Sequence, residues 1–229
     1  YNFESHEFEY VPGAIMGNII LADEINRTSP KTQASMLEAM EERRVTVDGK
    51  GHELPYPFVV IATQNPVMQR GTYYLPESQL DRFMMKLSVG YPDIRQSIQI
   101  VKNQIEGKTV KLMENVAGTE EWSELIKQAG EVAIKDELIV YAAECIECTR
   151  NHEKVQLGAS PRALLSWIKA AKSYAYVCGR GYVIPDDLKA LAYVVLCHRI
   201  ILKQNTDNDD EEGRRIITEV LGKVKVPIG

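Results

Sequence analysis

Two short apolar runs in the first half of the chain end abruptly in polar side chains. The first covers residues 18–22 and is followed at once by Asp23 and Glu24. The second covers residues 58–62 and is followed, three positions on, by Asn65. Unbroken β-branched runs of this length are typical of buried parallel strands, whose carboxyl ends lie along one ligand-binding edge of a sheet. We therefore expect Asp23, Glu24 and Asn65 to share that edge.

The segment between the two runs predicts a helix followed by a hairpin. Ser29 and Pro30 form a helix start, and apolar side chains then recur at helical spacing until Arg43 and Arg44. An Asp-Gly pair at residues 48–49 joins two short stretches with strand character, which is a signal for a β-hairpin. Strand, helix, hairpin and strand in this order indicate part of an α/β core.

Beyond the second run the pattern becomes helical almost throughout. A third apolar stretch at residues 84–89 stops at Gly90, and we expect the sheet-bearing part to end there. The expected fold class is α/β plus all-α, with residues 1–93 as part of an α/β core, 94–120 as a linker helix and loop, and 121–229 as an all-α domain. Helical periodicity predicts helices at residues 94–104, 121–128, 136–149, 161–178, 185–203 and 211–224.

Composition and charge exclude several classes of protein. A chain of 229 residues with 45% hydrophobic content is long enough for a sizeable core. Its net charge of −5 leaves no positive field to hold a phosphate backbone, so we expect no nucleic acid as main partner. The apolar runs fall far short of the ~20 residues that a membrane span requires. Four cysteines in helical patterns predict buried thiols in a reducing compartment, so we expect a cytoplasmic protein.

Adjacent carboxylates at the end of an apolar strand suit a site for magnesium and a nucleotide. Mg2+ takes oxygen ligands, partly through water, and hydrolysis needs a group that orients the attacking water. Asp23 would serve the metal and Glu24 the water, while Asn65 could hydrogen-bond a γ-phosphate or hold that water. Each residue also has a structural interpretation, because the acids can cap the next helix and Asn65 can be a turn residue before Pro66.

Two arginines help to distinguish these interpretations. Arg82 and Arg162 each follow a sharp local stop, so their guanidinium groups are presented near the ends of elements. Guanidinium groups in such positions can grip phosphate oxygens. The alternative for each is an ordinary surface salt bridge, which contributes little.

Taken together, these segments resemble the MoxR family of AAA+ ATPases over nearly the whole chain. Residues 21–27 (LADEINR) resemble its Walker B segment, and residues 62–66 (ATQNP) resemble its sensor 1. Residues 71–77 and 80–83 resemble its arginine-finger region. Residues 158–162 resemble its sensor 2, and residues 179–182 with 198–199 resemble its lid.

The resemblance implies a ring, expected to be a hexamer, with ATP bound between subunits. It implies that Asp23 holds Mg2+ through water, that Glu24 polarises the attacking water, and that Asn65 positions it. Arg162 would contact the nucleotide from the lid, and Arg82 would reach into the neighbouring subunit's site as an arginine finger. Family members act as chaperones that mature client protein complexes or insert metal into them, often beside a protein with a von Willebrand factor A domain.

The Walker A loop is the main departure from the family pattern. The sequence contains no Gly-x-x-x-x-Gly-Lys-Ser/Thr, whose lysine and backbone amides cradle nucleotide phosphates. The family places that loop ahead of the segment with which this sequence begins, so we expect an N-terminal part to be missing and this chain alone to be inactive. The alternatives are a non-hydrolysing AAA+-like interaction module that lends Arg82 to intact subunits, or a motor subunit of the magnesium-chelatase type.

Overall fold

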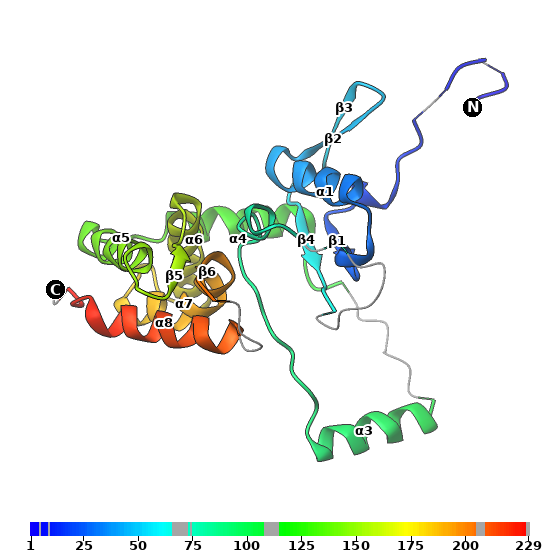
Figure 1. Cartoon of the computed structure of the whole chain (residues 1–229). Helices are drawn as coiled ribbons and strands as arrows, with labels where there is room; N and C mark the ends of the chain where they lie inside the picture. The colour runs from blue at the N-terminus through cyan, green and yellow to red at the C-terminus, as the bar shows by residue number, and fades with distance from the viewer. Residues whose placement is uncertain are drawn as a thin grey trace.

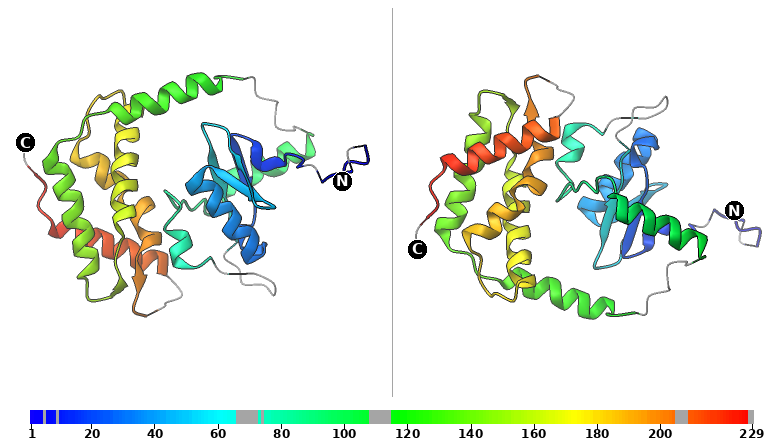
Figure 2. Two further views of the ribbon diagram at one scale, coloured as in Figure 1. Left: turned by 90° about the horizontal axis from the view of Figure 1, so that it is seen from above. Right: turned by 90° about the horizontal axis from the view of Figure 1, so that it is seen from below.

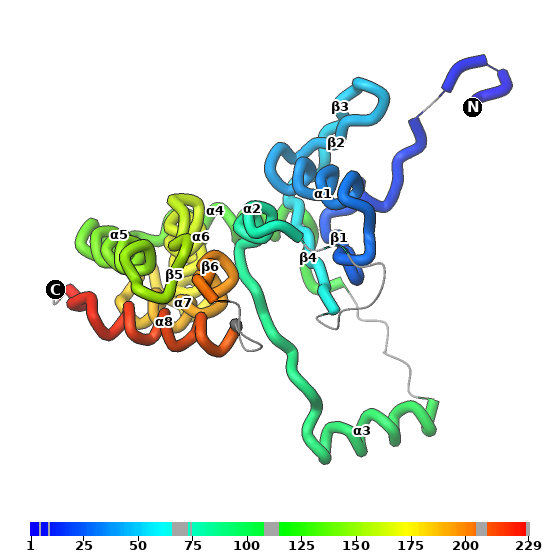
Figure 3. Tube along the Cα trace, viewed as in Figure 1, coloured from blue at the N-terminus to red at the C-terminus, as the bar shows by residue number. Residues whose placement is uncertain are grey.

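The computed structural model describes residues 1–4, 6–8, 10–65, 73, 75–107, 115–204 and 209–227. Figure 1 shows a sheet-bearing part that carries β1 to β4 and α1, and a helical part that carries α4 to α8. Figure 2 shows α2 (Glu77–Leu80) between these two parts in both views. Helix α3 (Ile94–Ile105) stands apart from both, and Figure 3 follows the chain from α2 out to it.

Strands β1 (Ile19–Ala22) and β4 (Val59–Ala62) form the central feature of the sheet-bearing part. They pair in parallel, with Ile19 opposite Val59 and Ala22 opposite Ala62. The two strands therefore end level with each other, as the sequence predicts. The polar residues that follow each strand emerge at the same edge.

The connection between the two strands follows the local sequence signals. Helix α1 (Pro30–Glu42) begins where the Ser29 side chain accepts a hydrogen bond from the Thr32 backbone N–H, and it ends at Arg43 in a left-handed conformation. Strands β2 (Arg44–Val47) and β3 (Lys50–Glu53) then form the expected hairpin. Its turn has φ of 49° at Asp48 and 77° at Gly49, the positive values that a tight hairpin turn requires.

The third apolar stretch, residues 84–89, does not form a strand. The Lys86 backbone N–H donates a hydrogen bond to the Val194 carbonyl at 2.8 Å, so this segment is attached to the helical part. Leu87 is 73% exposed and Val89 is 99% exposed. An extended segment becomes a strand only when a neighbour supplies the ladder of hydrogen bonds, and no described strand lies beside this one.

The helical part surrounds one continuous apolar core. Trp167 and Leu188 are fully buried in it, and the Trp167 indole N–H donates to the Leu188 carbonyl at 2.8 Å. Burial of a large aromatic side chain with its polar atom satisfied stabilises the packing of two helices against each other. The helices are α4 (Thr119–Glu131), α5 (Asp136–Arg150), α6 (Pro161–Val177), α7 (Pro185–Leu196) and α8 (Asp209–Lys223).

One helix is shorter than its periodicity predicts. Helix α7 ends at Leu196, and a single 3-10 turn, η3 (Cys197–Arg199), follows. The chain then forms β6 (Ile201–Leu202), which pairs antiparallel with β5 (Val155–Leu157). The helical part thus contains one short strand pair that the expected helix at 185–203 did not allow for. None of the described helices has the length and apolar character needed to cross a membrane.

Candidate functional site

Thr63 joins the ends of the two parallel strands. Its backbone N–H donates to the Ala22 carbonyl and its own carbonyl accepts from the Ile25 N–H, both at 3.0 Å, so the ladder continues past the strands. Its hydroxyl donates to Asp23 Oδ1 at 2.6 Å and accepts from the Glu24 backbone N–H at 2.8 Å. One side chain therefore fixes both predicted carboxylate residues against the neighbouring strand.

Glu24 has an unusual backbone conformation for its residue type. Its φ and ψ of 49° and 51° lie in the left-handed region, which costs a non-glycine residue on the order of 1 kcal/mol. Its carboxylate Oε2 lies 3.0 Å from Arg27 Nε, and the side chain is 38% exposed. The sharp backbone turn directs the chain into η2 (Ile25–Arg27) while leaving the carboxylate accessible at the sheet edge.

Asn65 lies at the same edge and is linked to the first strand's loop. The Asn26 side-chain amide donates to the Asn65 carbonyl at 3.1 Å, and the Tyr73 backbone N–H donates to the Asn26 carbonyl at 2.7 Å. The structure thus brings Asp23, Glu24 and Asn65 together, as their spacing predicts. Pro66 of the sensor 1 segment, together with Gly71, Thr72 and Tyr74 of the arginine-finger region, lies outside the described residues.

The two predicted arginines meet on one carboxylate. Arg82 NH1 lies 2.6 Å from Glu41 Oε2, and Arg162 NH2 lies 2.7 Å from Glu41 Oε1. Glu41 is on the last turn of α1, about 17 Å along the helix from Pro30 at 1.5 Å per residue. Arg82 and Arg162 pair with Glu41, whereas Asp23 bonds Thr63 and Glu24 pairs with Arg27, so the arginines and the strand-edge carboxylates form two groups. The contact of Arg162 with a nucleotide and the action of Arg82 on a neighbour stay predictions.

Thr63 and Glu41 are the residues that sequence reasoning missed. Thr63 had a usable signal, because it directly follows a strand that was expected to end level with Asp23. Glu41 had none, since only the tertiary fold brings Arg82 and Arg162, which are 80 positions apart in the numbering, to one side chain.

The strand edge offers the ligand types that magnesium prefers. Asp23 and Glu24 supply carboxylate oxygens, and Mg2+ in nucleotide sites is held by one or two carboxylates, water and phosphate. Within the described ranges, no group of three or more His, Cys, Asp or Glu side chains could hold a metal ion by itself. The residues present therefore fit an ion that a nucleotide brings with it, although these 229 residues contain no Walker A sequence.

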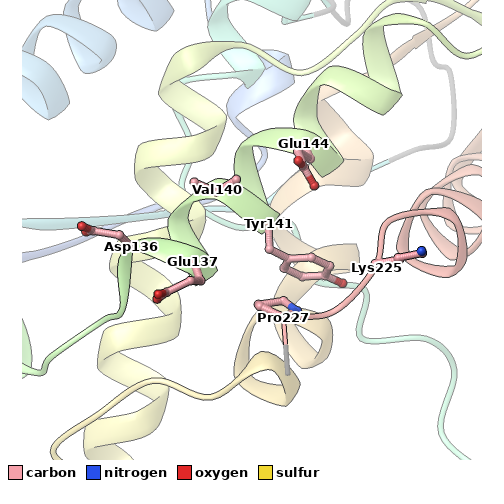
Figure 4. A pocket seen from close by; sticks show the side chains of 7 residues that line it. All are labelled: Asp136, Glu137, Val140, Tyr141, Glu144, Lys225 and Pro227. Atoms are coloured by element: carbon pink, nitrogen blue, oxygen red, sulfur yellow. The ribbon is translucent and has the colours of Figure 1, made fainter. Parts of the chain in front are cut away.

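A cavity of about 300 Å3 lies elsewhere, between α5 and the C-terminal segment. Figure 4 shows the Tyr141 ring between α5 and Pro227, with Lys225 beyond its hydroxyl. Burial, followed by the neighbouring Cys145, raises the pKa of Tyr141 above its usual value. None of the predicted site residues lines this cavity, so it is separate from the strand-edge site.

Comparison with known proteins places these features in a family. The family described as "ATPase family associated with various cellular activities (AAA)" matches residues 1–85, and the AAA lid domain matches residues 147–220. The uncharacterized protein YeaC of Bacillus subtilis is 46% identical over 228 residues, which are 100% of this chain and 71% of YeaC. Chaperone MoxR1 of Mycobacterium tuberculosis is 37% identical over 236 residues, which cover 99% of this chain and 62% of MoxR1.

A solved structure shares the fold. The crystal structure of a candidate ATPase from Cytophaga hutchinsonii matches with a TM-score of 0.88 and 36% identity, over 100% of this chain and 72% of that one. The paired parallel strands and the helical lid are those of an AAA+ ATPase. Within that class, the chain belongs to the MoxR family. It spans between 50% and 71% of the length of the relatives it matches.

Proposed function

We propose that the full-length protein is a MoxR-type AAA+ ATPase that couples ATP binding and hydrolysis to the remodelling or maturation of client protein complexes. Metal insertion into a client is one form that this work would take. The names of relatives support the proposal, since they include a chaperone MoxR1 and two proteins named MoxR. The proposal includes a cytoplasmic ring of six subunits, ATP with Mg2+, and a partner with a von Willebrand factor A domain.

The proposal rests on the two hydrogen bonds by which the Thr63 hydroxyl links the end of β4 to Asp23 and Glu24, a contact that we call the Thr63 junction. Hydrolysis needs an acid that holds the metal and a second group that orients water, fixed relative to each other. The Thr63 hydroxyl holds Asp23 Oδ1 and the Glu24 N–H at 2.6 and 2.8 Å, which provides that fixed relation. In this assignment Asp23 holds Mg2+ through water, Glu24 orients the attacking water, and Asn65 helps to position it.

The arginines would complete the site at the junction between subunits. Arg82 is assigned to the phosphoryl group of the neighbouring subunit, where a guanidinium stabilises the charge that develops during transfer. Arg162 is assigned to the nucleotide from the lid. Glu41 holds both side chains in the single chain, at 2.6 and 2.7 Å, so this carboxylate has to release them before they can contact phosphate.

The assignment to this class of ATPase also divides the chain into three parts. We assign residues 1–93 to the C-terminal part of the AAA+ core, 94–120 to a linker helix and loop, and 121–229 to the lid. The lid would move against the core as the nucleotide state changes.

Two alternative functions are each supported by one observation. The absence of a Walker A sequence from these 229 residues favours a non-hydrolysing interaction module for the chain by itself. A magnesium-chelatase subunit ChlI homolog from Methanocaldococcus jannaschii is 26% identical over 201 residues, which keeps a chelatase-type motor subunit as the second alternative.

Calorimetric titration with Mg-ATP tests the proposal. We expect the full-length gene product to bind Mg-ATP and the 229-residue chain not to bind it, because these 229 residues contain no Walker A sequence to cradle the phosphates. A full-length Glu24→Gln variant is the matched control, since it should bind Mg-ATP with unchanged affinity and release no phosphate. Failure of the full-length protein to bind Mg-ATP would overturn the ATPase assignment in favour of the non-hydrolysing module.

A further inference from the structure

The helical lid is hydrogen-bonded to Asp81 and Phe83, the residues on either side of Arg82. The Ser160 hydroxyl, at the start of α6, lies 3.0 and 2.9 Å from Asp81 Oδ1 and Oδ2, and it donates to this carboxylate. On the other side, the Phe83 carbonyl accepts from Arg199 NH2 at 2.7 Å and from His198 Nε2 at 3.0 Å. The backbone of Arg82 is therefore attached to the lid at the residue before it and at the residue after it.

Arg199 is the residue that contacts both attachment points. Its side chain is 0% exposed, and its Nε lies 3.5 Å from Asp81 Oδ1. Its NH2 group also donates to the Ser166 hydroxyl of α6 at 3.2 Å, which ties the guanidinium to the lid. A buried guanidinium group needs a carboxylate and hydrogen-bond acceptors to offset the loss of water. Asp81 supplies the counter-charge and the Phe83 carbonyl accepts from NH2, whereas Nε and NH1 donate no hydrogen bond to the described residues.

The extended guanidinium suits this position because its NH2 group bonds Phe83 and Ser166 while its Nε faces the Asp81 carboxylate at 3.5 Å. A lysine ammonium is a single point charge without this fork, so Arg199→Lys should weaken at least one of the three contacts. The attachment continues along the chain, where the Lys86 N–H donates to the Val194 carbonyl of α7 at 2.8 Å. The segment from Asp81 to Lys86 is thus bonded to α6, α7 and η3, and Figure 3 shows it beside the helical part before it departs for α3.

We infer that Arg199 is a positioning residue for Arg82: through Asp81 and the Phe83 carbonyl, the lid fixes the backbone of Arg82, while Glu41 of α1 holds its guanidinium. Once Glu41 releases the guanidinium, the Arg82 segment stays attached to the lid and not to the strand edge that carries Asp23 and Glu24. This inference rests on the proposed function for its catalytic consequence, because Arg82 is the group that would contact phosphate. The attachment itself is independent of that function.

Hydrogen exchange of the 229-residue chain tests the attachment without any activity. In Arg199→Lys, amides of the segment 81–86 should exchange at least tenfold faster, while those of α5 stay unchanged. Trp167→Phe is the matched control, since it removes a buried hydrogen bond in the lid core and does not touch the segment. Equal protection of residues 81–86 in Arg199→Lys and in the unsubstituted chain would overturn the inference.

Kinetics of the full-length protein test the catalytic consequence. Arg199→Lys should lower kcat for ATP hydrolysis at least tenfold with KM and Mg-ATP affinity within twofold, whereas Trp167→Phe should leave kcat within twofold. A loss of Mg-ATP affinity in Arg199→Lys as large as its loss of kcat would overturn the inference, because a residue that acts through Arg82 should leave nucleotide binding unchanged. If the unsubstituted full-length protein hydrolyses no ATP, the proposed function fails, and hydrogen exchange alone decides the attachment.

Discussion

Asp187 shows how a single side chain can serve two structural needs. Helix α7 begins after Ile184, whose side chain has no oxygen to cap the helix. The Asp187 carboxylate supplies the other bond of a capping box, since its Oδ2 accepts from the Ile184 backbone N–H at 2.8 Å, while the Asp187 N–H donates to the Ile184 carbonyl. The same carboxylate pairs with Arg180 at 2.5 and 2.8 Å, is only 2% exposed, and raises the pKa of that arginine.

Replacing this carboxylate should destabilise the fold. We expect Asp187→Asn to lower the free energy of unfolding by about 2 to 3 kcal/mol, because a half-buried Arg180 loses its counter-charge and the helix start loses an ionised acceptor. Asp186→Asn is the matched control, since Asp186 is 81% exposed and its change should stay within about 0.5 kcal/mol. Urea denaturation at pH 7 measures both. Equal losses in the two variants would contradict the role given to Asp187.

His198 should make the stability depend on pH. Burial lowers the pKa of His198 to about 4, and its Nε2–H donates to the Phe83 carbonyl. The unfolded chain, with an ordinary pKa near 6.5, binds the proton more readily than the folded chain does. Stability contributed by this group is therefore complete above about pH 6.5 and is lost as the pH falls towards 4, by up to roughly 3 kcal/mol.

The His198→Gln variant isolates this contribution, because glutamine can donate to the same carbonyl and does not titrate. Urea denaturation between pH 8 and 4 should show a smaller loss of stability in His198→Gln than in the unsubstituted chain. The two curves should run parallel above pH 7. Parallel curves through the acid range would show that His198 titrates normally in the fold.

Among the helices and strands, the sequence predicted those that depend on interactions within a few residues of the chain. The cap at Ser29, the Asp48-Gly49 turn and the two apolar runs all specify structure within a few residues of themselves, and the corresponding elements formed. The level ends of β1 and β4 followed from strand patterning, which is why Asp23, Glu24 and Asn65 could be placed together before the structure was known.

Elements that depend on distant partners could not be predicted in this way. Residues 84–89 have the composition of a strand but bond to Val194 of the lid, and a strand requires a neighbour that the pattern cannot reveal. Helix α7 stops at Leu196, and the 3-10 turn that follows places His198 and Arg199 on the Phe83 carbonyl, more than 100 positions away in the sequence. Glu41 likewise gains its two arginines only through the tertiary fold.

The Thr63 junction, which links β4 to the residues after β1, gives a further prediction. Thr63→Val keeps the side-chain shape but removes the hydroxyl that links β4 to Asp23 and Glu24, so the two acids lose their fixed relation. We expect full-length Thr63→Val to hydrolyse ATP about tenfold or more slowly. Thr63 is exposed, so unfolding free energy should change by less than about 1 kcal/mol. Thr63→Ser retains the hydroxyl and should keep most of the rate, and a rate equal to that of Thr63→Val would refute the junction's role.

In the whole molecule, the predicted carboxylates and the predicted arginines of the proposed site lie at different places. Asp23 and Glu24 precede α1, whereas Arg82 and Arg162 meet Glu41 on its last turn, about 17 Å along the helix from its start. In the single chain the Arg82 guanidinium pairs with Glu41 and contacts neither Asp23 nor Glu24. In the proposed ring we expect Arg82 to act on the site of a neighbouring subunit.

Mixing two inactive full-length variants tests this arrangement. Glu24→Gln subunits lack the water-orienting carboxylate but keep Arg82, and Arg82→Ala subunits have the reverse defect, so each should be inactive alone. In randomly mixed rings, roughly a quarter of the junctions pair an intact Glu24 with an intact Arg82 from the neighbour, and we expect up to that share of the normal hydrolysis rate. Phosphate release at equal subunit concentrations measures it. A double variant, Glu24→Gln with Arg82→Ala, should restore nothing when mixed with Arg82→Ala subunits. If the two single variants also restore nothing while still forming mixed rings, Arg82 acts within its own subunit, and the separation imposed by α1 must be closed by movement of the lid.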